Sequence, residues 1–388
     1  MLVQLNNIPY QVSLLSRSGW LQQAKELADI AQSRNAIDAA MHSSLMEMIS
    51  KSKPLDVSKG YEIYGIAYNS IISSLQLTKV EDYRDMKAAF QQGVKWIEIE
   101  TSSQCNRQCS YCPNSKFDRR SGNKFFDVER YRKMIRELTE IDYEGDIIFV
   151  GNNEFFMHKE NFSYLEETRS KLPNAKLKLI SNGDYINRAL LDRSADLGVS
   201  EIIITFHSAP NAPYSEAEVL DRAFKFQKQN GISFQLAEFK KNRVLRFITK
   251  HRNMIVWGGL FDYANVGHNW ATQMGEGPDN FVRITPCTYP IRQFILNYEG
   301  DIFMCCVSYK QKTEETVSTG SFVGNIVDYP TIFHAYAGDA LLNWRRGVFH
   351  TAAKTGPCER CIGHDGNIEE WFRSLAEYAD KRLNLSPK

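Results

Sequence analysis

The first part of the chain carries apolar residues at the spacing of α-helices. They recur every three to four positions from Leu21 to Ala31 and again from Ile37 to Met48, which predicts two amphipathic helices. Further helical regions are predicted at Ile63 to Leu75 and at Val80 to Phe90. We therefore expect residues 1–92 to form a helical N-terminal extension that packs on the core or makes a dimer contact. The alternative is that this extension recruits a substrate.

From Val94 onward the pattern changes to short apolar, β-branched runs that alternate with amphipathic segments. This alternation is typical of parallel strands joined by crossover helices. The predicted strands are Trp96 to Thr101, Asp146 to Gly151, Lys176 to Ser181, Glu201 to Ser208, Ile232 to Phe239 and Met254 to Gly259. One intervening helix is expected at Val128 to Glu140, behind Asp127 as its N-cap. The predicted fold class is α/β, a partial (β/α)6 TIM-like barrel over residues 93–275 with its chemistry at the C-terminal ends of the strands.

Composition limits the partners and the location. The chain has 388 residues, of which 43% are hydrophobic, and its 47 Lys and Arg nearly balance its 46 Asp and Glu. That balance suggests neither nucleic acid nor an anionic membrane as a partner. No apolar run reaches the roughly 20 residues of a membrane span, and the N-terminus lacks the pattern of a secretion signal. We therefore expect a cytoplasmic protein whose eight cysteines bind metal instead of forming disulfides.

Three of the cysteines lie in one short segment, Ser102 to Pro113, after the first predicted strand. Its sequence, S-S-Q-C-N-R-Q-C-S-Y-C-P, places Cys105, Cys109 and Cys112 in a C-x3-C-x2-C spacing. Three thiolates from one loop can hold three irons of a four-iron cluster and leave the fourth iron open for a substrate or cofactor. A zinc knuckle is the alternative, but a structural zinc site needs four ligands and this loop offers three.

With Tyr111 just before the third cysteine, the loop resembles the cluster-binding motif of the radical S-adenosylmethionine (SAM) superfamily. The resemblance covers about Val94 to Trp371. It implies that the open iron chelates the amino and carboxylate groups of SAM, and that electron transfer cleaves SAM to a 5'-deoxyadenosyl radical. It also implies SAM and a 4Fe-4S cluster as cofactors, and an electron donor such as flavodoxin or ferredoxin as a partner.

The ends of later strands carry further features of that family. The second strand ends in G-N-N-E, Gly151 to Glu154, where the family has a G-G-E segment that binds the amino group of SAM. The resemblance gives Glu154 this role, although Asn153 replaces a glycine and a plain strand-to-helix turn would also accept these residues. Other residues implied in SAM binding on the same grounds are Tyr111, Asn153, Ser181, Asn182, Ser208, Gln235 and Trp257.

The remaining cysteines gather toward the C-terminus. Those that could bind a complete auxiliary 4Fe-4S cluster are Cys287, Cys305, Cys358 and Cys361. Their spacing resembles the Twitch form of the SPASM extension, which implies a small C-terminal iron-sulfur lobe over residues 276–388. Gly300 fits a hairpin turn, and its G-x4-C spacing favours Cys305 over the neighbouring Cys306 as ligand. A four-cysteine zinc site is the alternative.

Together these features predict an enzyme that uses the 5'-deoxyadenosyl radical to take hydrogen from a small molecule, such as a sugar, an aminocyclitol or another natural product. Oxidation or epimerisation at carbon is the expected outcome, since the cofactor carries the chemistry. The arrangement of seven cysteines is similar to that of Twitch-bearing dehydrogenases of aminocyclitols, whose auxiliary cluster accepts an electron. Two alternatives stay open: a maturase that installs a crosslink or an epimerisation in a ribosomally made peptide, and an iron-sulfur sensor that never cleaves SAM.

The candidates for proton transfer are His268, Tyr263 and Arg292, which lie near the sixth strand end or in the auxiliary-cluster region. His268 is ranked first as the catalytic residue because imidazole titrates near neutrality. The alternative for His268 is a core histidine that hydrogen bonds satisfy.

Overall fold

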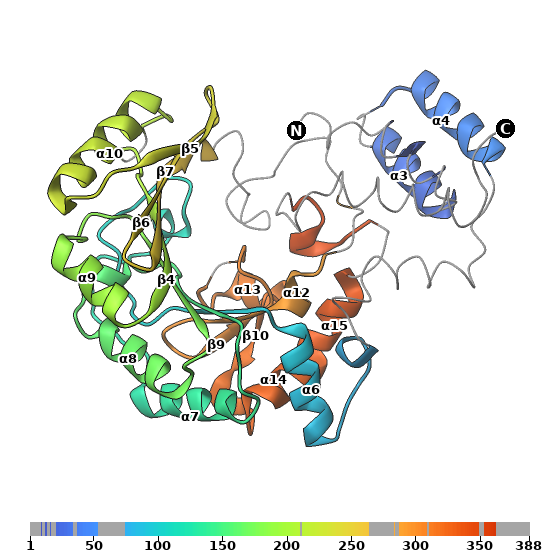
Figure 1. Ribbon diagram of the computed structural model, residues 1–388. Coiled ribbons are helices and arrows are strands. Elements are labelled where there is room, and N and C mark those ends of the chain that lie inside the picture. The colour runs from blue at the N-terminus through green and yellow to red at the C-terminus, as the bar shows by residue number, and fades with distance from the viewer. Residues whose placement is uncertain are drawn as a thin grey trace. The chain divides into compact units, whose positions relative to one another are not determined.

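Figure 1 shows the computed structural model, which describes residues 9, 12, 13, 16, 21–33, 37–52, 74–209, 212–263, 283, 287–308, 310–348 and 353–361. The chain divides into two compact units. Unit 1 comprises residues 1–79, 268–291 and 342–388, and unit 2 comprises residues 80–267 and 292–341. The three-domain division predicted from the sequence stays a prediction.

Unit 2 is built around one mixed sheet of ten strands in the order β10-β9-β8-β1-β2-β3-β4-β7-β6-β5. The strands are β1 (Trp96–Ile99), β2 (Asp146–Phe149), β3 (Lys176–Ser181), β4 (Val199–Thr205), β5 (Gln235–Lys240), β6 (Val244–His251), β7 (Met254–Phe261), β8 (Gln293–Leu296), β9 (Asp301–Phe303) and β10 (Phe322–Asn325). The run from β8 through β1, β2, β3 and β4 to β7 is parallel, whereas the strands at both edges are antiparallel. This confirms the predicted α/β class with a largely parallel sheet.

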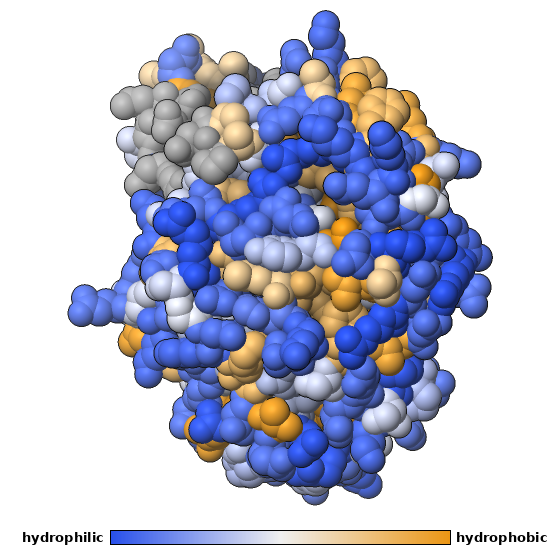
Figure 2. Space-filling view, turned by 90° about the vertical axis from the view of Figure 1, so that its left-hand side faces the viewer, coloured by the Kyte–Doolittle hydropathy of each residue, from blue (hydrophilic) through white to orange (hydrophobic). Residues whose placement is uncertain are grey.

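Helices cover the outer face of the curved sheet (Figure 1). They are α7 (Val128–Thr139), α8 (Asn161–Lys171), α9 (Arg188–Asp196) and α10 (Glu216–Asn230). Helix α7 begins as predicted, because the side chain of Asp127 accepts a hydrogen bond from Arg130 N. Figure 2 views the side on which these helices lie and shows a mainly hydrophilic surface, as expected for the solvent side of amphipathic helices.

The fifth predicted strand differs from the expected barrel. Strand β5 pairs antiparallel with β6, and β6 pairs antiparallel with β7. A tight turn joins β5 to β6: Arg243 N donates to Lys240 O at 2.9 Å, and Asn242 has a φ of 57°. This turn leaves no room for the crossover helix that a parallel neighbour would need. The sixth parallel strand is instead β8, which lies beside β1.

A second group of helices packs at the other end of unit 2. Helix α6 (Tyr83–Gly93), predicted from residue 80, contacts α14 (Ile332–Ala337). The ring of Phe90 lies 5.4 Å from that of Phe333 and 5.6 Å from that of Phe294, centroid to centroid, so this helix pair packs onto β8. The predicted hairpin forms between β8 and β9, with Gly300 at a φ of 81°. Shorter elements are η2 (Pro113–Ser115), η3 (Phe155–Met157), α13 (Glu314–Ser318) and η4 (Ile326–Asp328).

Unit 1 contains α3 (Leu21–Ser33), α4 (Ala39–Lys51), η1 (Ser74–Gln76) and η5 (Gly356–Cys358), while α12 (Tyr289–Arg292) and α15 (Asp339–Val348) continue from one unit into the other along the chain. Helices α3 and α4 confirm two predicted helices. The helix predicted at 63–75 lies almost entirely outside the described residues. Arg345, which is 1% exposed, donates from Nε to Gln76 O at 2.6 Å and joins α15 to η1. Across the described residues, we find no helix with both the length and the apolar character that a bilayer crossing requires.

Candidate functional site

The cysteine loop follows β1, as predicted, and hydrogen bonds close it. Cys105 N donates to Arg119 O at 2.8 Å, and Cys112 N donates to Cys109 O at 3.0 Å. Cys105 and Cys109 are buried, and Cys112 is partly exposed. The loop therefore presents three thiols from one closed turn at the C-terminal end of a central parallel strand.

The surroundings of these thiols suit a metal cluster. Burial raises the pKa of Cys105 to about 11 and that of Cys112 to about 12, so bound metal would have to supply the positive charge that ionises them. Two donors lie near Cys105 Sγ: Arg107 N at 3.5 Å and Asn182 Nδ2 at 4.0 Å. Within the described ranges, no three His, Cys, Asp or Glu side chains are arranged to hold a single metal ion. A four-iron cluster makes no such demand, because each thiolate binds a different iron.

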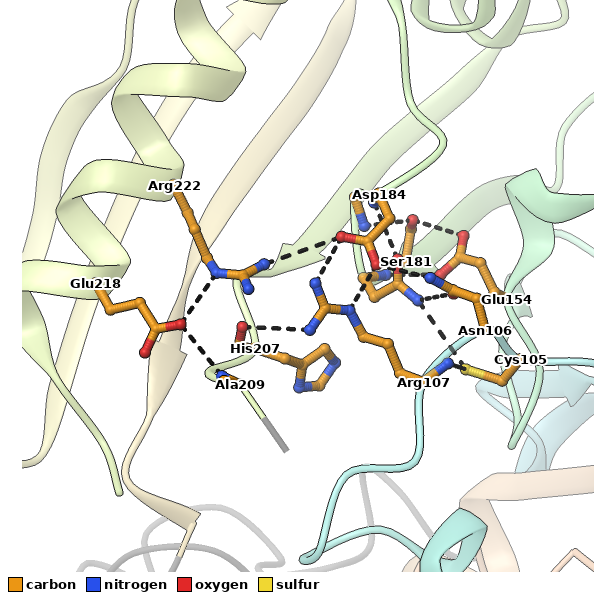
Figure 3. A network of polar contacts seen from close by, with 12 residues as sticks. Cys105, Asn106, Arg107, Glu154, Ser181, Asp184, His207, Ala209, Glu218 and Arg222 are labelled. Atoms are coloured by element: carbon orange, nitrogen blue, oxygen red, sulfur yellow. Dashed lines mark hydrogen bonds and ion pairs between the residues drawn. The ribbon is translucent and has the colours of Figure 1, made fainter. Parts of the chain in front are cut away.

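A two-pronged ion pair fixes the cysteine loop to the end of β3 (Figure 3). Arg107 donates from Nε to Asp184 Oδ2 at 2.7 Å and from Nη2 to Asp184 Oδ1 at 2.6 Å. Asn106 Nδ2 donates to the same carboxylate at 2.7 Å, and Asn182 Nδ2 donates to Asn106 Oδ1 at 2.7 Å. A planar fork of this kind adds geometric specificity to the charge attraction. The segment between the first two cysteines is thereby held in one place.

The same network reaches the end of β4 and helix α10 (Figure 3). Arg107 Nη1 donates to His207 O at 3.5 Å. Arg222 of α10 lies 3.9 Å from Asp184 Oδ1 and 3.5 Å from Glu218 Oε1. Two carboxylates and two guanidinium groups thus alternate from the cysteine loop through the end of β3 to helix α10, which balances the charge around the loop.

Glu154, at the end of β2, supports the turn after β3. It is 1% exposed, and Oε1 accepts hydrogen bonds from Ser181 Oγ at 2.7 Å and Phe156 N at 3.1 Å. Oε2 accepts from Asn182 N at 2.7 Å. Burial raises the pKa of Glu154 to about 7. Because a carboxylate offers about four acceptor positions, these bonds leave it room for one more donor.

Aromatic groups stack beside the third cysteine. The ring of Tyr111 lies parallel to that of Tyr263, with centroids 4.4 Å apart. Tyr111 Oη and His207 Nδ1 are 2.5 Å apart and share a hydrogen bond. Burial, followed by the nearby Arg107, lowers the pKa of His207 to about 3. His207 is therefore neutral at physiological pH, and its ring serves as a hydrogen-bond partner.

Several of the residues predicted to bind SAM gather around this loop: Tyr111, Asn153, Glu154, Ser181 and Asn182. Asn153 Nδ2 donates to Ser102 Oγ at 3.1 Å, which ties the G-N-N-E segment to the start of the loop. Ser208, just beyond the end of β4, is 5% exposed, and its Oγ has no hydrogen-bond partner among the described residues. A buried hydroxyl of this kind is available to a ligand.

Two other predicted residues lie apart from this group. Gln235 is exposed at the start of the edge strand β5, and both β7 and β6 lie between that strand and β4. Trp257 of β7 packs under the guanidinium of Arg246, with 4.5 Å from Cζ to the ring centroid. The predicted catalytic His268 lies outside the described residues. The roles of all three stay predictions.

The second cysteine group is distributed over both units. In unit 1, Arg283 N donates to Glu359 O at 2.8 Å and Lys354 N donates to Arg283 O at 2.9 Å, which joins the chain before Cys287 to the chain around Cys358. Lys354 interacts electrostatically with both of these thiols. Cys361, the third thiol of this unit, is buried.

The fourth predicted ligand, Cys305, lies in unit 2 shortly after β9 and is 6% exposed. Ser308 N donates to Cys305 O at 3.1 Å and closes a turn there. A hydrogen bond from the neighbouring Cys306 lowers the pKa of Cys305 below its ordinary value. The choice of Cys305 over Cys306 as ligand stays a prediction.

Sequence reasoning missed three residues of this site: Arg107, Asp184 and His207. A signal for each was present, since Arg107 lies between two of the cysteines, Asp184 follows the third predicted strand and His207 lies near the end of the fourth. Strand ends of a parallel sheet meet at one edge, so opposite charges placed there are candidates for pairing.

Comparison with known proteins bears on this site. The Radical SAM superfamily model matches residues 99–230. The S-adenosyl-L-methionine-dependent 2-deoxy-scyllo-inosamine dehydrogenase of Niallia circulans is 25% identical over 218 residues, which are 56% of this chain and 75% of that protein. A crystal structure of BtrN in complex with AdoMet and 2-DOIA is 22% identical, with a TM-score of 0.49, over 70% of this chain and 93% of that one. Streptococcus suis SuiB bound to S-adenosylmethionine is 12% identical, with a TM-score of 0.36, over 76% and 81% of the two chains.

The matched range contains the cysteine loop, the G-N-N-E segment and the ends of β3 and β4. Residues 99–230 are thus similar to the Radical SAM superfamily, and the similarity to a SAM-dependent dehydrogenase supports a radical SAM enzyme with an oxidoreductase-like activity. SAM and a 4Fe-4S cluster are the cofactors expected of this family. The residues present fit them, because buried thiols with nearby donors suit the cluster and the orphan hydroxyl of Ser208 suits a polar ligand beside it.

Proposed function

We propose that this enzyme oxidises a hydroxyl-bearing carbon of a small polar substrate, such as a sugar or an aminocyclitol. The observation that carries the proposal is the similarity to 2-deoxy-scyllo-inosamine dehydrogenase, which extends over 75% of that relative. That relative is named for an aminocyclitol substrate and for dependence on SAM. Sequence similarity over so much of that relative supports a related reaction on a related class of substrate.

The inner face of the sheet supports a polar substrate. Glu98, Lys178 and Glu201 lie in one register row across β1, β3 and β4, and therefore point to the same face. Lys178 Nζ lies 3.0 Å from Glu201 Oε2 and 2.7 Å from Asp146 Oδ2. Hydroxyl and ammonium groups of a substrate can exchange hydrogen bonds with such charged side chains, which an apolar substrate cannot do.

The chain's own residues would bind and orient SAM at the strand ends. Glu154 has one acceptor position left for the amino group, and the hydroxyl of Ser208 can hydrogen bond to a polar group of SAM. Tyr111, His207 and Tyr263 provide flat apolar surfaces for a base. Bound SAM and the first cluster would supply the hydrogen-atom abstraction, and a second cluster would act as the electron acceptor. Loss of one hydrogen atom, one electron and the hydroxyl proton would convert the alcohol to a ketone.

The second cluster is part of this proposal. Its ligands would be Cys287, Cys305, Cys358 and Cys361. Four soft thiolates suit an iron-sulfur cluster. An external electron donor such as flavodoxin or ferredoxin would reduce the first cluster. His268 remains the proposed group for accepting the substrate proton, since a neutral imidazole can take a proton near pH 7.

The test uses anaerobically reconstituted, reduced protein with SAM and aminocyclitols or aminosugars that carry deuterium on the hydroxyl-bearing carbons. We expect deuterium in 5'-deoxyadenosine and a ketone in the substrate, both measured by mass spectrometry. Deuterium transfer from the Cα of a peptide, with no transfer from any cyclitol or sugar, would instead identify a peptide maturase. Protein that binds a cluster but forms no 5'-deoxyadenosine under any condition would be a sensor.

A further inference from the structure

Strand β5 ends the sheet of unit 2, beside helix α10 (Figure 1). It pairs with β6 along one edge, and across the residues that the structure describes no strand pairs with its other edge. Such an edge offers a row of N–H and C=O groups to another strand, so proteins usually shorten, charge or cover it. Every residue of β5 except Glu238 is exposed, so this strand is open to solvent.

One face of β5 is apolar. Leu236 and Phe239 lie opposite Phe247 and Leu245 of β6, and opposed residues of an antiparallel pair point to the same face. A register shift between Leu236 and Glu238 brings these two residues to one face despite their odd spacing. Although their partners on β6 are buried, Leu236 is 62% exposed and Phe239 is 53% exposed. Together they form an apolar patch instead of a single exposed side chain.

Helix α10 packs on the same face without covering this patch. The ring of Phe226 lies 6.0 Å from that of Phe234, which in turn lies 6.0 Å from that of Phe247, centroid to centroid. The main strand contacts of the helix are with β6 and β7. Its Leu220 and Phe224, one turn apart, are 38% and 64% exposed. The helix therefore leaves β5 uncovered and adds exposed apolar side chains of its own.

The other face of β5 carries two opposite charges. Glu238 and Lys240 lie opposite Arg246 and Val244, and Lys240 Nζ is 2.7 Å from Glu238 Oε1. Phe239 lies between them in the sequence, so an antiparallel copy of β5 centred on Phe239 would place each glutamate opposite a lysine. Centring the two strands on Glu238 or on Lys240 would instead place like charges opposite each other, which is destabilising. The charges therefore favour one register of self-pairing over its neighbours.

We propose that β5 pairs antiparallel with β5 of a second copy of this chain, about a two-fold axis at Phe239. The protein is then a homodimer in which one sheet continues across both copies. A two-fold interface must be self-complementary, because the same surface meets itself. This strand fulfils that condition on both faces, since unlike charges oppose each other on one and the two Phe239 rings pack together on the other. The inference does not depend on the reaction that the enzyme catalyses.

The experiment measures the mass of the full-length protein by analytical ultracentrifugation over a range of concentrations, where the wild type should form dimers. Glu238→Lys places lysines opposite lysines, and Lys240→Glu places glutamates opposite glutamates. Each variant alone should therefore dissociate at least about tenfold more readily. A mixture of the two variants should recover the dimer, because each lysine of one then faces a glutamate of the other. The double variant Glu238→Lys/Lys240→Glu should dimerise to within about threefold of the wild type.

Arg132→Glu is the matched control, because Arg132 also belongs to an exposed ion pair, with Glu129 at 2.7 Å, but on helix α7. It should leave association unchanged. A wild-type monomer at every concentration would overturn the proposal, and so would a dimer that both charge variants retain. Dissociation of both variants without recovery in their mixture would overturn the register and the proposal with it. Phe239→Asp, at a half-exposed position, should also dissociate the dimer and decides the matter if Glu238→Lys does not fold.

Discussion

The two cysteine groups differ in how the chain assembles them. The first lies within one loop of unit 2, from Cys105 to Cys112, and a network anchored by Asp184 holds that loop. The second extends from Cys287 to Cys361 along the chain, with Cys305 in unit 2 and the other three predicted ligands in unit 1. A local ligand set depends mainly on the geometry of one turn. A distributed set depends on the fold of the whole chain, so its cluster should also be the more sensitive to distant changes.

The surroundings of the two groups differ as well. The first is enclosed by paired charges, with Arg107 and Arg222 on either side of one carboxylate. The second has single lysines close to its thiols, Lys354 in unit 1 and Lys310 in unit 2. The first arrangement favours fixed geometry around SAM. Under the proposed function, the second arrangement would place positive charge next to the ligands of the auxiliary cluster.

The largest expected effect is that of removing the local group. The triple variant Cys105→Ala/Cys109→Ala/Cys112→Ala should reduce the iron content from about eight to about four per chain and abolish 5'-deoxyadenosine formation. The auxiliary cluster should remain, because none of its ligands lies in the loop. Iron analysis and a SAM cleavage assay check this, and an unchanged iron content would contradict the assignment of the loop.

Removing one ligand of the distributed group should separate cleavage from product formation. Cys361→Ala is expected to keep the first cluster and to form 5'-deoxyadenosine that carries deuterium from labelled substrate, but to stall before the ketone. If the auxiliary cluster is mainly structural, the same change should lower solubility and the content of both clusters. Normal ketone formation by a well-folded variant that lacks the auxiliary cluster would exclude both roles.

A smaller effect is expected at Glu154. Glu154→Ala removes an acceptor for the SAM amino group and for the turn after β3, and a hydrogen bond to a charged group contributes about 1.5–3 kcal/mol. SAM affinity, measured by calorimetry, should fall roughly ten- to hundredfold while both clusters remain. Glu166→Ala is the control, since Glu166 forms an exposed pair with Arg193 at 2.7 Å and should change affinity little. Equal affinities in the two variants would rule out the role of Glu154.

The smallest effect is expected at the surplus thiol. Cys306→Ser should leave the iron content and the auxiliary spectrum nearly unchanged, because Cys305 is the expected ligand. Cys305→Ser should lose about four irons per chain. The reverse pattern would show that the neighbouring thiol ligates the cluster.

Much of the fold could be predicted from local patterns. Strand β3 has the predicted limits, and α7 begins behind Asp127 as expected. The antiparallel hairpin of β5 and β6 could not be foreseen in the same way, because apolar runs indicate strands but not their direction. The tight turn at Asn242, with its positive φ, is what makes the two strands antiparallel. In the sequence, however, this segment looks like an ordinary loop among charged residues.

The site could be predicted where a short sequence motif contains its residues. It could not be predicted where contacts between distant segments bring the residues together. The cysteine loop and Glu154 follow from short motifs. The fork between Arg107 and Asp184 joins residues from two strand ends, and the neutrality of His207 comes from burial that the tertiary structure creates. Neither depends on residues that are neighbours in the sequence.

Strand β1 also limits how far the enzyme can be treated as modular. Glu98 of this strand binds Lys310, from the C-terminal part, and Glu100, just after the strand, binds Arg119, which follows the cysteine loop. A chimera that receives its C-terminal part from a relative without a matching lysine would leave Glu98 buried and unpaired, which commonly costs about 3–5 kcal/mol. Exchange of the two parts should therefore succeed only when β1 is exchanged with them, and the crossover point belongs upstream of Trp96 instead of at the end of the barrel.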